Sequence, residues 1–288
     1  KNFLGGKYVK KFEKDCRKYF NVKHAITVNS WTSGLIAIIG SINVEPGDEI
    51  ILSPITMSAC AASIIHWGCV PIFCDVDEET FNIDPRKIEN KISKKTKAIM
   101  AIDLFGQPCD MKEIKKICKK YNLTFICDSA QSIGARYMNS FSSTMADVGG
   151  YSLNFHKHIN TGEGGIIVTN NNRIAKRCQL IRNHAETTID SNKVDSLNNM
   201  VGYNFRLTEI QAAIGIEQLK KLKKIVKKKI DIAYKLNNSL KKLPGIEVPI
   251  IKEKRSHVFY SYPMKINDKI TKVNRDKIWK MLTLEGIP

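Results

Sequence analysis

The sequence has no paired cysteines and no long apolar run. Its eight cysteines stand singly at positions 16, 60, 69, 74, 109, 118, 127 and 178, so no C-x-x-C pair is present to bind zinc. Several fall inside apolar, strand-like stretches such as PIFCDV and TFICDS, which favours buried, reduced thiols. No apolar run approaches the ~18 residues that a membrane-spanning helix needs, and the first residues lack a signal-peptide core. We therefore expect a soluble, cytoplasmic protein with no metal site and no membrane contact.

Acidic residues are scarce relative to basic ones. The 288 residues include 46 Lys and Arg against 28 Asp and Glu, a net charge of +18. Such a charge raises the possibility of a nucleic-acid partner. The lysines, however, are spread over several helical segments, such as MKEIKKICKK and EQLKKLKKIVKKKI, where they form a solvated face. A polyanionic substrate would also favour positive charge, and we do not expect nucleic-acid binding.

Apolar runs and helical patterns alternate through the first 130 residues. Strands are expected at about 24–29, 48–54, 70–76, 98–104 and 123–129, with helices at 32–42, 57–67, 85–92 and 111–121 between them. The strand runs are continuous and rich in β-branched residues, which is typical of a parallel sheet covered on both faces. The fold class predicted is α/β, with a three-layer α/β/α domain around a mostly parallel sheet.

The pattern changes after residue 148. Two strand-like runs, 148–154 and 165–170, are followed by a helix at 173–183 and a long helical run from Thr208 to Leu243. The remaining residues begin a second, smaller α/β unit. We expect a large domain over residues 1–235 and the start of a small C-terminal domain, incomplete in this chain, over 236–288.

Two hydroxyl side chains follow the first predicted strand, in the stretch NSWTSG. Thr32 and Ser33 stand where a helix is predicted to begin, so their N–H groups and hydroxyls could hold a phosphate at the helix N-terminus. An ordinary N-terminal helix cap explains the same residues. This stretch alone leaves both interpretations open.

A carboxylate, Asp128, ends the buried strand LTFICDS. In apolar surroundings it needs a cationic or hydrogen-bonding partner, and a protonated pyridine nitrogen would serve. Gln131, three residues later, would lie nearby if the chain turns. Asp128 could equally be a capping residue.

The stretch SLNFHKHINTGEGG places Lys157 between two histidines and before a turn rich in glycine. A partly desolvated lysine has a lowered pKa and can form a Schiff base. A surface lysine in a hairpin is the alternative. His156 and His158 lack a third ligand at a usable spacing, which argues against zinc. Together, a phosphate cradle, a carboxylate for a pyridinium and a lysine are the parts that a pyridoxal phosphate (PLP) site requires.

With these residues in place, the sequence resembles the DegT/DnrJ/EryC1/StrS family of PLP-dependent nucleotide-sugar aminotransferases, which have the fold type I, aspartate aminotransferase-like architecture. The resemblance covers almost the whole chain, from FLGGKYVKKF through EPGDEIILSP, PIFCDVDEETFNIDP and DLFGQPCDM to LEGIP. The combination of D-x-A-Q, S-x4-K-x4-GEGG and GYNFR is specific to that family. Family members continue beyond LEGIP, so we expect the chain to lack C-terminal residues.

The resemblance implies a role for each matched residue. Lys157 is similar to the lysine that binds the cofactor covalently, Asp128 to the carboxylate on the pyridine nitrogen, and Gln131 to the side chain near the ring oxygen. Ser152 resembles the hydroxyl that binds the phosphate beside the helix N-terminus. Asn204, in GYNFR, resembles the asparagine that reaches the phosphate of the neighbouring subunit, which implies a homodimer with shared active sites.

The sequence departs from the family pattern at several positions. Trp31 replaces a glycine, so its side chain must turn away from the phosphate or into the substrate pocket. Met57 stands where an aromatic ring commonly stacks on PLP, and a thioether can still cover that ring. Asp103 stands where many relatives have histidine. His184, in RNHA, is near a family motif beside the substrate, although a structural histidine fits equally well.

The implied activity is transfer of an amino group from an amino acid, usually L-glutamate, to a keto group of a nucleotide-linked deoxysugar. This is the reaction of the perosamine/viosamine-synthase type, and it belongs to deoxyaminosugar and polysaccharide biosynthesis. A related branch dehydrates sugars at C3 with histidine in place of the lysine, and Lys157 argues against it. A non-enzymatic PLP-fold regulator that binds nucleic acid is the remaining alternative.

Overall fold

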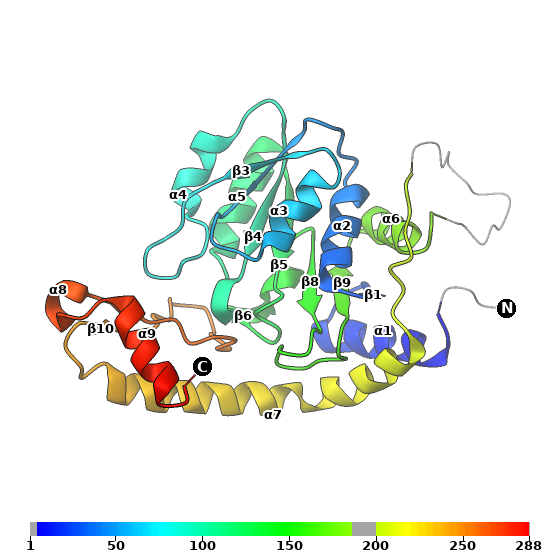
Figure 1. The fold of residues 1–288 in the computed structure, drawn as a ribbon. Coiled ribbons are helices and arrows are strands. Elements are labelled where there is room, and N and C mark those ends of the chain that lie inside the picture. The colour runs from blue at the N-terminus through cyan, green and yellow to red at the C-terminus, as the bar shows by residue number, and fades with distance from the viewer. Residues whose placement is uncertain (1–4, 186–199, 288) are drawn as a thin grey trace, which may run out of the picture.

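The structure, a computed structural model, describes residues 5–185 and 200–287. A seven-stranded sheet lies at its centre, with the order β1-β9-β8-β5-β4-β2-β3 (Figure 1). β9 runs antiparallel to its neighbours β1 and β8, and the other neighbouring strands pair in parallel. The sheet consists of β1 (His24–Val28), β2 (Glu49–Leu52), β3 (Val70–Phe73), β4 (Thr96–Ile102), β5 (Thr124–Asp128), β8 (Val148–Ser152) and β9 (Gly165–Thr169).

Helices cover both faces of this sheet. Alternate side chains of a strand point to opposite faces. In β5, Ile126 packs into the core under α2, α3 and α6, whereas Phe125 and Cys127 pack under α4 and α5. On the latter side, Tyr151 and Ile166 pack against α1 and α7. The helices are α1 (Lys7–Phe20), α2 (Trp31–Ser41), α3 (Ser58–Ile65), α4 (Pro85–Ile88), α5 (Met111–Tyr121), α6 (Asn172–Arg182) and α7 (Glu209–Leu240).

This arrangement confirms the predicted α/β class and the mostly parallel sheet. Short elements complete the large sheet's surroundings: the hairpin of β6 (Arg136–Tyr137) and β7 (Ser140–Phe141), and single 3₁₀ turns at Glu89–Lys91, Leu104–Gly106 and Ser142–Thr144. Across 5–185 and 200–287, no helix combines the length and apolarity needed to cross a bilayer.

The carboxyl ends of several strands lie close together at one end of the sheet. Val28 of β1 and Ser152 of β8 both pair with Gly165, the first residue of β9, and Asp128 of β5 pairs with Gly150. The carboxyl ends of β1, β5 and β8 therefore meet at this edge, where ligands of open α/β sheets bind. The connection from 153 to 164, which carries Lys157, begins and ends there.

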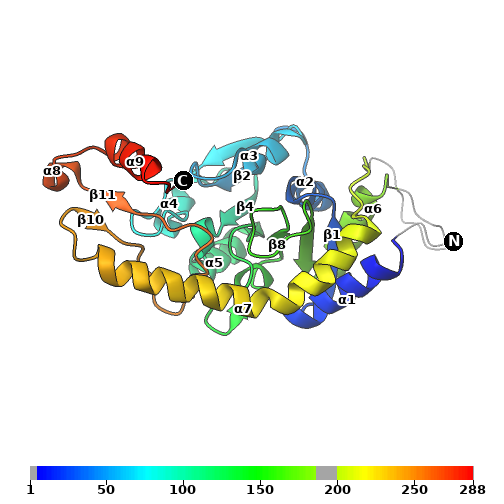
Figure 2. The ribbon, with the colours of Figure 1, turned by 60° about the horizontal axis from the view of Figure 1, so that its bottom comes forward.

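The long helix α7 links the sheet to the C-terminal elements. It begins with a capping box, in which the Thr208 side chain and the Gln211 side chain each bond the other residue's backbone N–H. Figure 2 shows α7 running from beside α1 to the C-terminal elements, which are β10 (Ile246–Glu247), β11 (Lys265–Ile266), α8 (Asp268–Thr271) and α9 (Arg275–Leu284). The domain boundary expected after residue 235 falls within α7 and stays a prediction.

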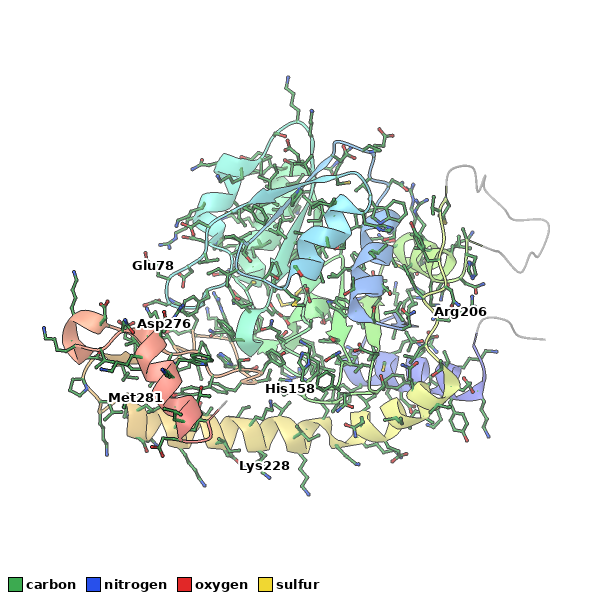
Figure 3. All side chains as sticks on the ribbon, viewed as in Figure 1. Glu78, His158, Arg206, Lys228, Asp276 and Met281 are labelled. Atoms are coloured by element: carbon green, nitrogen blue, oxygen red, sulfur yellow. The ribbon has the colours of Figure 1, made fainter. Side chains whose placement is uncertain are left out.

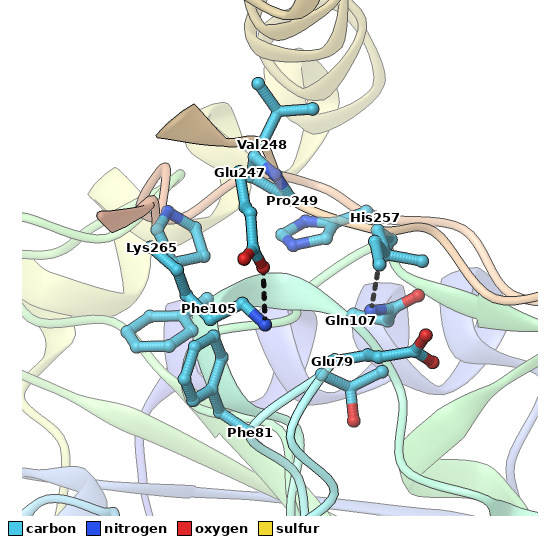
Figure 4. Close-up of a pocket in the computed structure, with 12 residues that line it drawn as sticks. Glu79, Phe81, Phe105, Gln107, Glu247, Val248, Pro249, His257 and Lys265 are labelled. Atoms are coloured by element: carbon cyan, nitrogen blue, oxygen red, sulfur yellow. Dashed lines mark hydrogen bonds and ion pairs between the residues drawn. The ribbon is translucent and has the colours of Figure 1, made fainter. Parts of the chain in front are cut away.

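A small pocket marks where the C-terminal segment meets the loops of the large sheet (Figure 4). Glu247 and Lys265 form an ion pair of 2.7 Å between the paired strands β10 and β11. Gln107 Nε2 donates to the carbonyl of Ile250 at 3.0 Å. The cavity of about 10 Å³ has room for about one water molecule, so this contact is a packing interface and not a ligand site.

Candidate active site

A cavity of about 220 Å³ opens at the carboxyl ends of β1, β5 and β8. It is lined by side chains from α2, from the end of β5, from the end of β8 and from the 153–164 connection. Seven residues singled out from the sequence border it: Trp31, Thr32, Met57, Asp128, Gln131, Ser152 and Lys157. The sequence motifs therefore converge on one place.

Asp128 is the buried acid of the cavity, with 3% of its surface exposed. Its Oδ1 accepts from the backbone N–H of Ala130 at 2.9 Å and from Trp31 Nε1 at 2.7 Å. Its Oδ2 accepts from the Cys60 thiol at 3.1 Å. Burial raises the pKa of Asp128, and these donors and the charge of Lys157 oppose the rise. The donors thus favour the ionised carboxylate.

The Trp31 side chain has two directions open to it from the sequence, away from the phosphate or into the substrate pocket. The ring is buried, with 7% of its surface exposed, and its N–H bonds Asp128 at the inner wall of the cavity. Its predicted contact with substrate stays a prediction.

Lys157 is half-buried on the β8–β9 connection. Burial lowers the pKa of its amine below the usual lysine value, and the charge of Asp128 opposes that shift. Its Nζ lies 4.2 Å from the centroid of the Tyr260 ring, a cation–π contact. A lysine with a lowered pKa is the form suited to act as a nucleophile and a base.

The N-terminus of α2 provides an anion-binding end to the cavity. Ser30 caps the helix, since its Oγ accepts from the Ser33 N–H at 3.1 Å and lies 2.9 Å from the Ser33 hydroxyl. Ser33 is therefore buried in the cap, whereas Thr32 is exposed on the cavity. The N–H groups of Trp31 and Thr32, in the first turn, have no carbonyl of their own helix to bond. The Ser152 hydroxyl, at the end of β8, lines the same cavity.

Met57 and Gln131 border the cavity from two other elements. Met57 is the N-cap residue of α3 and is 67% exposed. Gln131 Oε1 accepts from the backbone N–H of Phe105 at 2.7 Å, which fixes the amide. Their expected contacts with the cofactor remain predictions.

Asn204 and His184 lie away from this cavity. Asn204 lines a second cavity together with Asn29 and Arg206, and its carbonyl accepts from Asn29 Nδ2 at 3.2 Å. His184 is exposed, with φ of 56°, and its backbone N–H donates to the carbonyl of Tyr203. Neither residue contributes to the site around Lys157 within one chain.

Two residues of the site were not singled out from the sequence. Cys60, from α3, reaches Asp128, and Tyr260, from the C-terminal segment, reaches Lys157. Cys60 was read only as one of several buried thiols. Nothing in the local sequence pairs Tyr260 with a lysine about a hundred positions earlier.

Asp103, which departs from the family pattern, lies outside the cavity as a buried carboxylate. Its Oδ2 accepts from the hydroxyls of Ser129 at 2.9 Å and Ser132 at 2.8 Å, and also from Ser142. Its Oδ1 accepts from the Cys109 N–H at 2.9 Å. Burial raises the pKa of Asp103, and these donors oppose the rise. Its hydrogen bonds join the end of β4 to the residues that follow β5.

Two buried histidines, His158 and His257, are held neutral by their burial. His158 lies between the sheet and α7 (Figure 3), where its Nε2 lies 2.8 Å from the Val258 carbonyl. His257 Nδ1 accepts from the Phe259 N–H at 3.0 Å. Burial lowers the pKa of each imidazole from 6.5 to about 4.

These pKa values predict a loss of stability in mild acid. Below pH 6.5 the unfolded chain binds protons that the folded chain excludes, so the free energy of unfolding falls until about pH 4. The loss is roughly 3 kcal/mol for each histidine. Urea unfolding at pH 7.5 and 4.5 measures it. His257→Phe should remove the share of that residue and so reduce the pH dependence, while replacement of the exposed His66 by Gln should leave it; equal slopes in all three proteins would contradict the assignment.

The polar groups of the cavity fit pyridoxal phosphate. The first turn of α2 and the Ser152 hydroxyl suit an anion. Asp128, buried and bonded by three donors, suits a protonated ring nitrogen, and Lys157 suits an aldehyde. In the described part of the chain, no cluster of three or more His, Cys, Asp or Glu side chains is arranged to hold a metal ion.

Comparison with known proteins identifies the family of the chain. The model of the DegT/DnrJ/EryC1/StrS aminotransferase family matches residues 1–288. The chain is 34% identical over 283 residues to the GDP-perosamine synthase of Caulobacter vibrioides, covering 98% of this chain and 75% of that protein. PseC of Helicobacter pylori, an aminotransferase involved in pseudoaminic acid biosynthesis, matches with a TM-score of 0.90 at 30% identity, over 98% of this chain and 75% of that one.

A further solved structure bears on the cofactor. NtdA of Bacillus subtilis, with its cofactor PMP bound, matches with a TM-score of 0.83 at 32% identity, over 94% of this chain and 62% of that one. The predicted family, enzyme class and cofactor are thus confirmed. The chain belongs to the DegT/DnrJ/EryC1/StrS aminotransferase family, and it is a PLP-dependent sugar aminotransferase.

Proposed function

We propose that this protein transfers an amino group from L-glutamate to a keto group of a nucleotide-linked deoxysugar, in the manner of the perosamine and viosamine synthases. The observation that carries the proposal is that Lys157, Asp128, Ser152 and the N-terminus of α2 border one cavity. The activity named for the Caulobacter relative supports a nucleotide sugar as acceptor. The net charge of +18 suits a diphosphate-bearing substrate.

The chain's own residues would hold the cofactor in four ways. Thr32 and Ser152 receive the phosphate at the N-terminus of α2, where the unpaired N–H groups and the helix dipole favour an anion. Asp128 would hold the proton on the ring nitrogen. Met57 and Gln131 would flank the ring, and Lys157 would bind the cofactor covalently.

Lys157 is the group that moves protons. When bound, PLP supplies a ring that accepts an electron pair from the substrate carbon. The neutral amine of Lys157, favoured by its lowered pKa, takes a proton from the α-carbon of the amino donor and later returns one to the carbon of the sugar that receives nitrogen. The Tyr260 ring covers the amine on one side and limits its contact with water.

The position of Asn204 supports a homodimer. Because it lies in a different cavity of its own chain, its proposed contact with a phosphate requires the site of a partner. We therefore propose a homodimer with two shared active sites.

The rival functions are less well supported. Sugar 3-dehydration in the related branch uses histidine at the lysine position, and this chain has Lys157 there. A regulator that binds nucleic acid would use the basic residues of the surface and would not need a cavity lined by Lys157 and Asp128. Salt-sensitive DNA binding by a protein without amino transfer would favour that function.

A half-reaction separates these possibilities. The PLP-loaded protein is first treated with L-glutamate, and loss of the cofactor's absorbance reports amino transfer to the cofactor. Nucleotide-linked keto-deoxysugars that differ in nucleotide and in keto position are then added one at a time. We expect one class to restore the absorbance. If none does while simple keto acids do, the sugar substrate is wrong and the aminotransferase assignment stands.

A further inference from the structure

The indole of Trp31 is bound to the acid of the active site. Trp31 Nε1 donates to Asp128 Oδ1 at 2.7 Å, and both side chains are buried, at 7% and 3% exposed. An indole N–H is a donor only, so this bond requires an acceptor oxygen on Asp128. The neighbouring Cys60 thiol bonds the other carboxylate oxygen at 3.1 Å.

The Trp31 ring packs closely against glycines, where a larger residue would clash with it. A Cβ added at Gly150 of β8 would lie 2.5 Å from Trp31 Cη2, and one at Gly34 of α2 would lie 2.9 Å from Trp31 Cε3. A Cβ at Gly165 would lie 3.1 Å from the Trp31 Cα. Contacts below 3.0 Å do not occur without a shift of one partner. The ring is therefore fixed in position by close packing, and its N–H is aimed at Asp128.

The carboxylate needs such a donor. Taking an ionised carboxylate out of water is costly, so in an apolar site it tends to take up a proton. With a proton, Asp128 would lose the charge that attracts a protonated ring nitrogen. Together, the N–H of Trp31, the N–H of Ala130 and the Cys60 thiol bond both oxygens and hold the carboxylate in one orientation.

We propose that Trp31 is a positioning residue for the cofactor: its indole N–H orients the Asp128 carboxylate and keeps it ionised, so that the carboxylate binds the protonated ring nitrogen of PLP. The inference rests on the proposed role of Asp128 and deepens it. Trp31 acts through Asp128 and moves no proton itself.

The test measures the dissociation constant of PLP for the apoprotein, and the pH titration of the absorbance of the bound cofactor. Trp31→Phe keeps a ring and removes the donor. Loss of one hydrogen bond to a charged group should weaken PLP binding about 10- to 100-fold and shift the titration. Trp67→Phe is the matched control, because Trp67 Nε1 donates to the Ile36 carbonyl at 2.8 Å and lies outside the cavity; it should leave both quantities unchanged.

Chemical rescue separates hydrogen bonding from filling of space. Trp31→Gly leaves an indole-sized gap, to which indole and indene are added in turn. Indene has nearly the same shape and no N–H. Indole should restore PLP affinity and indene should not; equal rescue by both would overturn the inference. If Trp31→Gly does not fold, the Trp31→Phe comparison decides alone, and wild-type affinity with an unshifted titration would refute the role of Trp31.

Asp128→Asn distinguishes this failure from failure of the proposed function. If Asp128→Asn weakens PLP binding and Trp31→Phe does not, the proposed role of Asp128 stands and the role of Trp31 falls. If Asp128→Asn leaves the affinity and the titration unchanged, the proposed contact of Asp128 with the ring nitrogen is itself wrong.

Discussion

Lys157→Ala is expected to lower the rate of amino transfer by about 10⁴-fold, since it removes both the nucleophile and the group that moves the proton. Of the described residues that line the cavity, Lys157 is the one that carries an amine, so no neighbour can replace it. Borohydride treatment of the PLP-loaded protein, followed by peptide mass analysis, should find the adduct on Lys157 and none in the variant.

The control is Lys228, an exposed lysine of α7 that does not line the cavity. Lys228→Ala should keep the adduct and most of the activity. An adduct that persists in Lys157→Ala would show that another amine holds the cofactor.

The same variant tests the shared site. If Asn204 serves the partner's phosphate, a mixed dimer of Lys157→Ala and Asn204→Ala chains contains one site with an intact lysine and an intact asparagine. Mixing the two inactive proteins should therefore recover a measurable fraction of the wild-type rate. No recovery from a proven mixed dimer would place both residues in the site of one chain.

Asp128→Asn is expected to lower the rate by about 10²- to 10⁴-fold, because an amide carries no charge to hold a proton on the ring nitrogen. The amide oxygen can still accept from Trp31 and Ala130, so the local geometry is preserved. The variant should fold at least as stably as the wild type, since it removes the cost of burying a charge. Single-turnover rates with L-glutamate check the expected loss of rate. Thermal melts check the expected stability.

Asp103→Asn provides the contrast. It alters the other buried carboxylate near β5, which three serine hydroxyls and one N–H bond. We expect it to lower stability more than the rate per folded molecule. If Asp128→Asn behaves like Asp103→Asn, with a lower melting temperature and an unchanged rate, Asp128 is structural as well.

The sequence predicted the residues that backbone topology alone brings together. Asp128 and Ser152 end parallel strands, and Lys157 follows one of them, so their meeting needs only the order of strands. The orientation of Trp31 depends on its packing against Gly150 of β8, and the approach of Tyr260 depends on how the C-terminal segment folds back. These contacts arise from tertiary packing, which leaves no local pattern in the sequence.

The long helix α7 helps to position the Tyr260 ring that lies over Lys157. Its buried residues lie mainly in the first half, at Ala212, Gly215, Ile216, Leu219 and Leu222, with Ala233 beyond them. Past Leu222 the helix extends about 27 Å to Leu240, at 1.5 Å per residue. The second half of the helix therefore packs against the large sheet's core much less than the first half does.

Two residues of the second half of α7 bond the segment that covers the active site. Tyr262 bonds Asn237 of α7, and Lys229 of α7 bonds the carbonyl of Tyr260. The same segment is bonded to the loop after β4, where the Val258 N–H donates to the Gly106 carbonyl at 2.9 Å. The ring over Lys157 is therefore held from two directions, by the long helix and by the large sheet.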